Sequence, residues 1–274
     1  WSLRAGLGWD HAATPEAGDK LVKQPDDAVA ANLRLARRIG DDTQAFAAVS
    51  RRSRFPSLRE LYSGALGRFV PNPDLAPERQ DQIEIGASRA AENWRLEAAA
   101  FIGWLDGGIE KVALPNSSEL FQRVNQTRIR VPGLELIGTW EPATNLQLQA
   151  QHTILSARTE IEEAFAQPAE DRPDYLSWLS CRWRPATGPG VSCAARLTGP
   201  RWSADATAAD GLTRLPAGVT YHLRLNWNWA LGPDRTGDLE AYLRLDNLFD
   251  QAVSYQIGLP EPGRVIAAGF RLTI

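Results

Sequence analysis

The feature of this sequence that most constrains its fold is a strict alternation of apolar and polar residues over long stretches. From Val219 to Trp229 every odd-numbered residue is apolar and every even-numbered residue is polar. Side chains of a β-strand point alternately to its two faces, so this pattern predicts a strand between an apolar and a polar environment. An apolar face also repeats at every second residue from Trp94 to Trp104 and along residues 266–274.

Similar segments follow one another along the chain, and the links between them alternate in length. The links after the second, fourth, sixth, eighth and tenth segments are short, and those after the odd-numbered segments are long. The segments are longer than the average strand of a globular protein, which has about 5–6 residues. Short turns at one end and long loops at the other are typical of antiparallel transmembrane β-barrels. The twelve predicted strands cover residues 1–11, 28–39, 43–54, 80–91, 93–106, 127–141, 145–158, 174–185, 190–202, 218–230, 238–248 and 264–274.

The spacing of the tryptophans supports a membrane setting. Trp94 and Trp104 lie on the same predicted face, and at ~3.3 Å per residue they are about 33 Å apart along the strand. A tilted strand of that length spans an apolar band of roughly 25 Å between two girdles of aromatic residues. We therefore expect Trp94, Trp104, Tyr221 and Trp229 to face outward, although a large soluble β-sandwich or propeller with a tryptophan-rich core also fits the periodicity.

The composition excludes several classes of function. The chain has 30 lysine and arginine residues against 33 aspartate and glutamate residues, and this lack of a basic surplus speaks against nucleic-acid binding. The three histidines lie on separate segments, and no phosphate loop, nucleophile elbow or Cys-x-x-Cys motif occurs. We expect no catalytic residue, no metal site and no cofactor. The chain begins at Trp1 and contains no methionine, which predicts a fragment or a processed chain.

Two motifs are specific enough to indicate a family. The first is SRRSRFPSLRELY at residues 50–62, followed by NPDLAPER at residues 72–79. The second is LDNLFD at residues 245–250, followed by GLPEPGR at residues 258–264. Both closely resemble signatures of TonB-dependent outer-membrane receptors, in the family's order and spacing, and RIRVPGLEL at residues 128–136 is a weaker match. Phe55 replaces a more usual alanine, and Tyr255 is the nearest tyrosine to a position, Val253, where the family often has one.

The resemblance implies an all-β fold in the outer membrane of a Gram-negative bacterium. Such receptors have a 22-stranded barrel that an N-terminal plug domain closes, so residues 1–274 would be one domain holding the last twelve strands, without the plug. The implied function is active uptake of an iron–siderophore complex, heme or cobalamin, energised by the TonB system through the absent plug. The implied partners are membrane lipid, the small-molecule solute and the outer-membrane assembly machinery. That machinery would read the final strand, where Ile274 replaces the usual aromatic residue.

The motif residues have a structural and a ligand-binding interpretation. Prolines restrict the backbone and asparagines bond nearby amides, so most of these residues would set loop shape and end strands. Residues of the outer loop next to the first motif are the candidates for ligand contact, namely Arg54, Tyr62, Arg68 and Phe69. The structural candidates are Pro56, Glu60, Asn72, Pro73, Glu78, Asn247, Leu248, Phe249, Asp250, Gly263 and Arg264.

Arginines on the predicted inner face are open to two interpretations. They could guide an anionic ligand, or they could be solvated wall residues that Glu97, Glu135, Glu240 and Asp246 balance. The arginines are Arg34, Arg38, Arg182, Arg184, Arg196, Arg224 and Arg244.

Two further expectations concern local geometry. The apolar positions change from odd to even at Pro132–Gly133, and a β-bulge there would keep one face apolar. Cys181 and Cys193 are equally far from a short turn, which places them opposite each other on the apolar face. They could form a disulfide or serve as two small apolar side chains.

Two other functions remain compatible with the sequence. A passive outer-membrane porin has the same strand pattern but lacks the motif at residues 50–79 and needs no plug. A soluble β-rich carbohydrate-binding module would not need two aromatic girdles. Insolubility in sarkosyl and heat-modifiable migration on a gel separate the module from the membrane proteins, and dependence of uptake on the TonB system separates the receptor from the porin.

Overall fold

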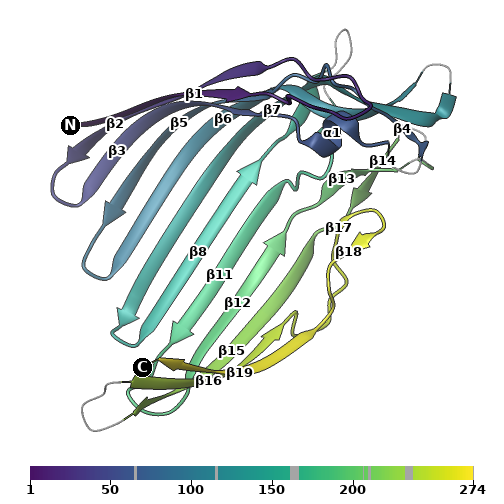
Figure 1. Cartoon of the computed structure of the whole chain (residues 1–274). Coiled ribbons are helices and arrows are strands. Elements are labelled where there is room, and N and C mark those ends of the chain that lie inside the picture. The colour runs from purple at the N-terminus through teal and green to yellow at the C-terminus, as the bar shows by residue number, and fades with distance from the viewer. Residues whose placement is uncertain are drawn as a thin grey trace.

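The chain forms one large, curved antiparallel sheet with small accessory strands at one end (Figure 1). The computed structural model describes residues 1–64, 67–114, 117–160, 167–205, 207–208, 211–231 and 237–273. The main path runs through strands β1 (Ser2–Ala12), β2 (Asp26–Ile39), β3 (Thr43–Arg54), β5 (Glu78–Ala90), β6 (Trp94–Leu114), β7 (Ser117–Ala143), β8 (Leu146–Leu155), β11 (Tyr175–Trp183), β12 (Gly190–Thr198), β15 (Gly218–Leu231), β16 (Gly237–Asp246) and β19 (Val265–Thr273).

These twelve strands correspond one to one with the twelve predicted segments. Each is paired antiparallel to its neighbours in this order, which confirms the predicted meander. Among the described residues, β1 and β19 are the two edges of the path, so the sheet is open there. Residues 232–236 in the tenth link and Ile274 lie outside the described residues.

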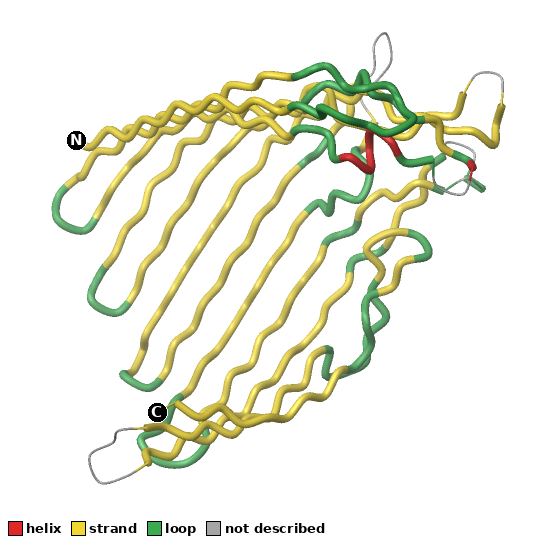
Figure 2. Tube along the Cα trace, in the orientation of Figure 1, coloured by secondary structure: helices red, strands yellow, loops and turns green. Residues whose placement is uncertain are grey.

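The accessory elements gather at the end of the sheet that carries the long connections. They are the short helix α1 (Leu58–Tyr62) and strands β4 (Phe69–Val70), β9 (Arg158–Glu160), β10 (Gln167–Pro168), β13 (Arg201–Ala204), β14 (Leu212–Leu215), β17 (Ser254–Gln256) and β18 (Leu259–Pro260). Figure 2 shows the short turns and both termini at the opposite end. In the part of the chain that the structure describes, no helix is long and apolar enough to cross a membrane.

One face of the sheet consists of exposed apolar side chains. Leu7 is 83% exposed and Phe270 is 79% exposed, and exposed leucines and isoleucines continue from strand to strand between them. Tyr221 and Trp229 are exposed on this apolar face. Trp94 and Trp104 are half-buried and lie on the same face of β6 as the exposed Leu96. This agrees with the outward direction predicted for all four. In water so large an apolar surface would be a liability, whereas against lipid it is required.

The polar face holds the small buried core of the sheet. The buried apolar cluster of the described residues consists of Ala36 on β2, Phe46 on β3 and Ala99 on β6, with Gly86 of β5 between Phe46 and Ala99. The Phe46 ring covers Gly86, where an added β-carbon would be 2.6 Å from the ring atom Cζ. A glycine opposite an aromatic residue therefore lets the ring lie flat on the neighbouring strand.

The predicted bulge at Pro132–Gly133 is wrong. Strands β6 and β7 stay in register from Trp94–Trp140 to Leu105–Ile129, and the irregularity lies between Leu105 and Gly108. Gly133 has another role, because its missing side chain leaves room for the Phe101 ring, whose Cζ would be 2.4 Å from an added β-carbon.

Pro132 is tolerated within β7 because its backbone points toward the end of β8. The Ser156 amide donates to the Pro132 carbonyl at 3.0 Å, and the side of β7 that faces β6 keeps its register. Proline lacks an amide hydrogen, so it fits where no strand continues opposite it. Ile129 and Val131 consequently remain on the polar face.

The two cysteines are directly opposed, as predicted, and both are free thiols. We expect thiol labelling under denaturing, non-reducing conditions to count two reactive cysteines per chain, because the pair lies among apolar side chains and acts as small apolar residues. A count of zero would show instead that the oxidising periplasm closes the bridge.

Candidate functional site

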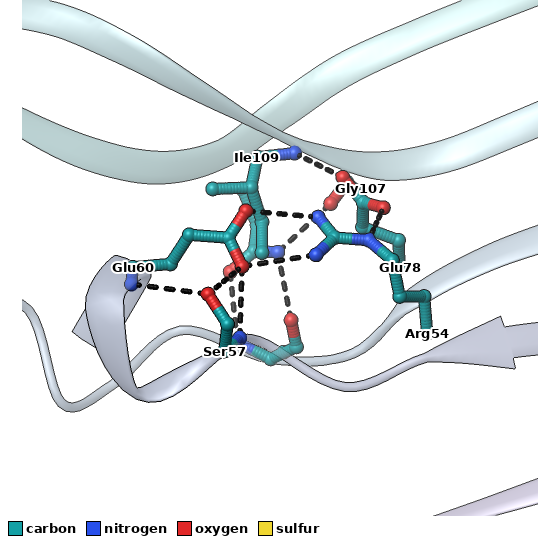
Figure 3. Close-up of polar contacts among 8 residues, drawn as sticks. Arg54, Ser57, Glu60, Glu78, Gly107 and Ile109 are labelled. Carbon is teal, nitrogen blue, oxygen red and sulfur yellow. Dashed lines mark hydrogen bonds and ion pairs between the residues drawn. The ribbon is translucent and has the colours of Figure 1, made fainter.

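The long connection between β3 and β5 is held by a single arginine (Figure 3). Arg54 donates from Nε to Glu78 Oε2 at 2.6 Å, from Nη1 to Glu60 Oε2 at 2.9 Å and from Nη2 to Glu60 Oε1 at 3.1 Å. The second oxygen of Glu78, Oε1, accepts from the Ile109 amide at 2.8 Å. We call Arg54, Glu60 and Glu78 the arginine hub. It joins β3, α1, β5 and β6, so this predicted ligand contact serves the framework of the loop.

Helix α1 is short but has a complete N-terminal cap. Ser57 Oγ accepts from the Glu60 amide at 3.3 Å, and Glu60 Oε2 accepts from the Ser57 amide at 2.8 Å. This reciprocal capping box satisfies amides that a helix start leaves open. Pro56, directly before the cap, stiffens the entry, and Leu61 is the buried residue of the helix. Glu60 thus serves both the cap and the arginine hub.

Two asparagines fasten the rest of this connection to the β6–β7 hairpin. Asn72 donates from Nδ2 to the Arg123 carbonyl at 2.7 Å. Asn125 Oδ1 accepts from the Ala76 amide at 2.8 Å, and its Nδ2 donates to the carbonyls of Ala76 and Gly107. Pro73 stiffens the backbone after Asn72. The motif at residues 72–79 is therefore a docking segment for the hairpin.

The connection between β1 and β2 docks on the same segment through a buried lysine. Lys23 is only 7% exposed, and its Nζ donates to the Leu75 carbonyl at 2.6 Å and pairs with Asp26 at 2.6 Å. The Lys23 amide donates to Tyr62 Oη at 3.0 Å. Tyr62, a predicted ligand contact, is thereby committed to loop packing.

Above these contacts, two phenylalanines and three cations form an open cluster. Phe69 of β4 and Phe121 of β7 have ring centroids 5.9 Å apart. Arg123 lies 4.5 Å over Phe69, and Lys111 and Arg68 lie 4.4 Å and 5.8 Å over Phe121. We call these five residues the cation–aromatic cluster. Among the side chains that the structure describes, which leave out those of residues 117–119, none of the three cations forms an ion pair with a carboxylate, and Lys111 interacts electrostatically with Glu170.

The cluster brings together two predicted ligand contacts, Arg68 and Phe69, with three residues that the sequence did not single out. Lys111, Phe121 and Arg123 lie in residues 107–126, which were expected to be a loop and are instead a long hairpin extension of β6 and β7. The loop prediction failed because the apolar alternation ends at this point, where both faces of the hairpin meet water. Phe69 and Phe121 are paired through the parallel bridge of β4 to β7.

A polar cavity of about 1280 Å³ lies beside the arginine hub. Its lining includes Glu78, Glu110, Glu160 and Glu170 against Arg128 and Arg172. Burial, together with Asp171 and Glu110, raises the pKa of Glu170. The cavity therefore carries the opposite charge to the cation–aromatic cluster. Among the described residues, no group of three or more histidine, cysteine or acidic side chains could hold a metal ion.

The C-terminal motif ends β16 in a fixed turn. Asn247 is 4% exposed, and its side chain bonds both the amide and the carbonyl of Gln251 at 2.9 Å. Asp250 Oδ1 accepts from the Arg264 amide at 2.7 Å, and an added β-carbon at Gly263 would lie 2.6 Å from that oxygen. Asn247 and Asp250 both have positive φ angles, 49° and 56°.

The two residues between them attach this turn to β15. The Leu248 amide donates to the Tyr221 carbonyl at 2.8 Å, and the Phe249 ring packs edge-on against Tyr221 with centroids 5.3 Å apart. These contacts give the C-terminal motif residues positions in strand termination and strand-end packing.

Two arginines, Arg196 and Arg201, fix the long connection between β16 and β19. Arg196 bonds Glu261 and donates to Tyr255 Oη at 2.8 Å, and buried Arg201 donates to the Tyr255 carbonyl at 2.7 Å. Tyr255 thus lies between two guanidinium groups, which accounts for a tyrosine near this point of the motif.

Acid is expected to loosen the connection held by the arginine hub. The ion pair with Arg54, assisted by Ser57, lowers the pKa of Glu60 from 4.5 to about 2. Because the pKa is lowered in the folded state, ionised Glu60 stabilises the loop at pH above 4.5, and this stability is lost as the pH falls toward about 2. Limited proteolysis across this range should show increasing cleavage at residues 55–77. A Glu60→Gln variant should be cleaved at the same rate at every pH in this range. If its cleavage increased with acid as much as that of the unchanged protein, the assignment to Glu60 would be contradicted.

Comparisons with known proteins agree with this architecture. Residues 1–257 match the family model described as TonB dependent receptor-like, beta-barrel. A solved structure of the copper transporter OprC is 18% identical with a TM-score of 0.70, covering 98% of this chain and 44% of that one. The ferric-catecholate import receptor Fiu from E. coli is 15% identical with a TM-score of 0.68, covering 99% and 42%.

A third structure, BauA, the ferric preacinetobactin receptor from Acinetobacter baumannii, is 12% identical with a TM-score of 0.71, covering 99% of this chain and 40% of that one. The chain thus spans about two fifths of the length of these similar structures. A comparison with curated proteins finds no match.

Proposed function

The chain belongs to the TonB-dependent receptor-like β-barrel family, and from this premise we propose that it works in a receptor that actively transports a scarce, bulky solute. Its localisation is the outer membrane, as for the family, with the apolar face against lipid. In this proposal residues 1–274 form one domain, the C-terminal part of a 22-stranded barrel. An N-terminal plug outside this sequence couples that barrel to the TonB system.

The observation that carries the proposal is the anchoring of three long connections into one platform. Passive diffusion needs no such structure, whereas a receptor must hold a binding surface in a fixed geometry before the solute arrives. The arginine hub and the two asparagines tie the β3–β5 connection to the β6–β7 hairpin, and Lys23 adds the β1–β2 connection. This platform presents the cation–aromatic cluster at the loop end of the sheet.

We assign the solute contacts to the cation–aromatic cluster. Arginine and lysine beside aromatic rings offer both charge and stacking, so they suit an anionic solute with planar groups. Arg68 and Phe69 keep the ligand-contact role expected from the sequence, with Phe121, Lys111 and Arg123 beside them. Arg54 and Tyr62 act on the solute only through the platform.

The solute class that fits best is an iron–siderophore complex. Two of the similar structures are a ferric-catecholate import receptor and a ferric preacinetobactin receptor, and one is a copper transporter. Heme and cobalamin stay as the alternatives within this function.

A binding panel tests the proposal. The protein, purified from outer membranes in detergent, would be titrated with a ferric catecholate, a ferric hydroxamate, heme, cobalamin and Cu²⁺, with tryptophan fluorescence as the signal. We expect saturable binding of an iron–siderophore complex that weakens at least about tenfold, or 1.4 kcal/mol, in an Arg68→Gln/Arg123→Gln variant. The control is Arg214→Gln, an exposed arginine of β14 outside the cluster. Equal losses in both variants, or no binding of any member, would contradict the proposal.

Extraction from the cells that make the protein separates the alternatives. A receptor or a porin should resist extraction by sarkosyl and migrate differently on a gel after heating. Extraction into buffer without detergent would favour a soluble carbohydrate-binding module.

A further inference from the structure

The apolar face ends abruptly toward the long connections, between one row of opposed residues and the next. Directly opposed residues of antiparallel strands share a face of the sheet. The last apolar row on β3, β5, β6 and β7 consists of Val49, Ile83, Ile102 and Pro132. The next row, from β3 to β9, consists of Arg51, Asp81, Trp104, Arg130 and Arg158. This charged row is the margin of the lipid-facing surface, since an aromatic residue such as its tryptophan marks the membrane–water interface.

Two arginines of the charged row face each other without a compensating charge. Arg51 donates to both oxygens of Asp81, at 2.6 Å and 3.0 Å. Arg130 of β7 and Arg158 of β9 are exposed and directly opposite each other. Among the side chains that the structure describes, which leave out those of residues 161–166, neither forms an ion pair. Like charges directly opposite on a sheet destabilise it, so this pair needs an anion.

The carboxylates in the row beyond are engaged with other arginines or lie apart. Asp106 pairs with Arg79 and, at 3.2 Å, with Arg128. Glu160 lies opposite Arg128, two residues further along the strands than the arginine pair, or about 6.6 Å. The two charged rows together hold five arginines and three carboxylates among the described residues. Two positive charges therefore remain, and they are those of Arg130 and Arg158.

Apolar side chains lie directly beside this pair, on the side of the membrane interior. Leu134 of β7 and Ile154 of β8 are opposite each other and are 54% and 48% exposed. Trp104, opposite Arg130 on β6, lies on the same face. A ligand that fits here carries its negative charge at one end and hydrocarbon at the other, which is the chemistry of an anionic lipid.

We propose that Arg130 and Arg158 bind the phosphate groups of a lipid headgroup in the outer leaflet of the membrane. Outer-membrane barrels carry their longer loops outside the cell, so this margin meets the outer leaflet. The planar fork of arginine matches a phosphate with two parallel hydrogen bonds, and two arginines suit a headgroup with two phosphates. The acyl chains then lie along the apolar row and the leucine and isoleucine next to it. The site belongs to the lipid-facing surface, so a plug inside the lumen does not cover it.

The test measures binding of a phosphorylated glycolipid to the protein purified from outer membranes in detergent. The probe is diphosphoryl lipid A in detergent micelles, with native mass spectrometry as the readout, and lipid A without its phosphates is the reference. We expect the diphosphoryl form to bind at least about tenfold, or 1.4 kcal/mol, more tightly than the reference. In Arg130→Gln/Arg158→Gln this preference should disappear, because both guanidinium groups are gone.

Two further variants separate a lipid site from a loss of folding. Arg130→Glu places a carboxylate opposite Arg158, so this variant should lose the preference while its heat-modifiable migration stays unchanged. The matched control is Arg95→Gln/Arg182→Gln, which removes two exposed arginines from the polar face near the short turns. The control should keep the full preference for the phosphorylated lipid.

Several results would overturn the inference. They are equal affinity for the two lipids, an unchanged preference in the variants of Arg130 and Arg158, or an equal loss in the control. Binding of inorganic phosphate with the affinity of the lipid would also overturn it, because the pair would then be a site for a soluble anion. The measurement involves neither a siderophore nor the TonB system. The inference therefore goes beyond the proposed function, and a failure of one is distinguishable from a failure of the other.

Discussion

Replacing Phe270 by aspartate is expected to reduce sharply the amount of protein in the outer membrane. Phe270 points from β19 onto the apolar face, opposite Ala241 and between exposed apolar neighbours. A charged arginine or lysine on the lipid face of a barrel costs roughly 2–4 kcal/mol at the midplane, and aspartate somewhat less. The protein should therefore accumulate outside the membrane fraction, measured as the amount of heat-modifiable protein in purified outer membranes.

The matched control for this change is Ala267→Asp on the same strand. Ala267 lies on the polar face opposite Arg244, where a carboxylate is easily accommodated. We expect its outer-membrane yield to equal that of the unchanged protein. Equal yields for Phe270→Asp and Ala267→Asp would refute the assignment of the two faces.

Replacing Arg54 by alanine is expected to release the β3–β5 connection from the hairpin. The change removes three hydrogen bonds between charged groups and leaves Glu60 and Glu78 side by side without their cation. Hydrogen bonds to charged groups contribute about 1.5–3 kcal/mol each when they are protected, and less at a half-exposed site like this one. Faster thermolysin cleavage at residues 55–77 and at least about tenfold weaker solute binding should follow.

The control and the rescue make this prediction specific. Arg59→Ala removes an exposed arginine on α1 that lies outside the hub and should change neither measurement. Arg54→Ala combined with Glu60→Gln should recover part of the protection, because one of the two uncompensated charges is gone. An Arg54→Ala protein with normal protection and normal binding would show that the hub does not hold the platform.

The strands could be predicted from the sequence because a two-residue period follows directly from the geometry of a strand between two solvents. The alternation at residues 219–229 gave the strand, its faces and its place in the order. The same logic paired Cys181 with Cys193 through a short turn. This reasoning failed at Pro132–Gly133, where the apolar residues change from odd to even positions. Such a change arises either from a β-bulge or from apolar residues that lie on the polar face. The Phe101 ring over Gly133 selects the second, and no local pattern encodes that contact.

The candidate site was less accessible to sequence reasoning because its contacts join distant segments. Residues 50–79 could be recognised as important, but the partners of Arg54 and Asn72 depend on how the loop folds back on β6 and β7. Phe121 and Arg123 were missed, because the cluster exists only where β4 bridges to β7 in parallel. The arginines of the polar face were noted, yet only the register shows that Arg224 and Arg244 are opposed.

Uptake in matched cells with and without the TonB system tests the central claim most directly. Cells that make the protein would receive radiolabelled iron bound to the siderophore identified in the binding panel, and surface-bound and internal label would be separated. The account predicts internal label in cells with the TonB system and its loss in cells without, while surface binding stays equal. Equal internal label in both strains would contradict active transport and make the protein a passive channel.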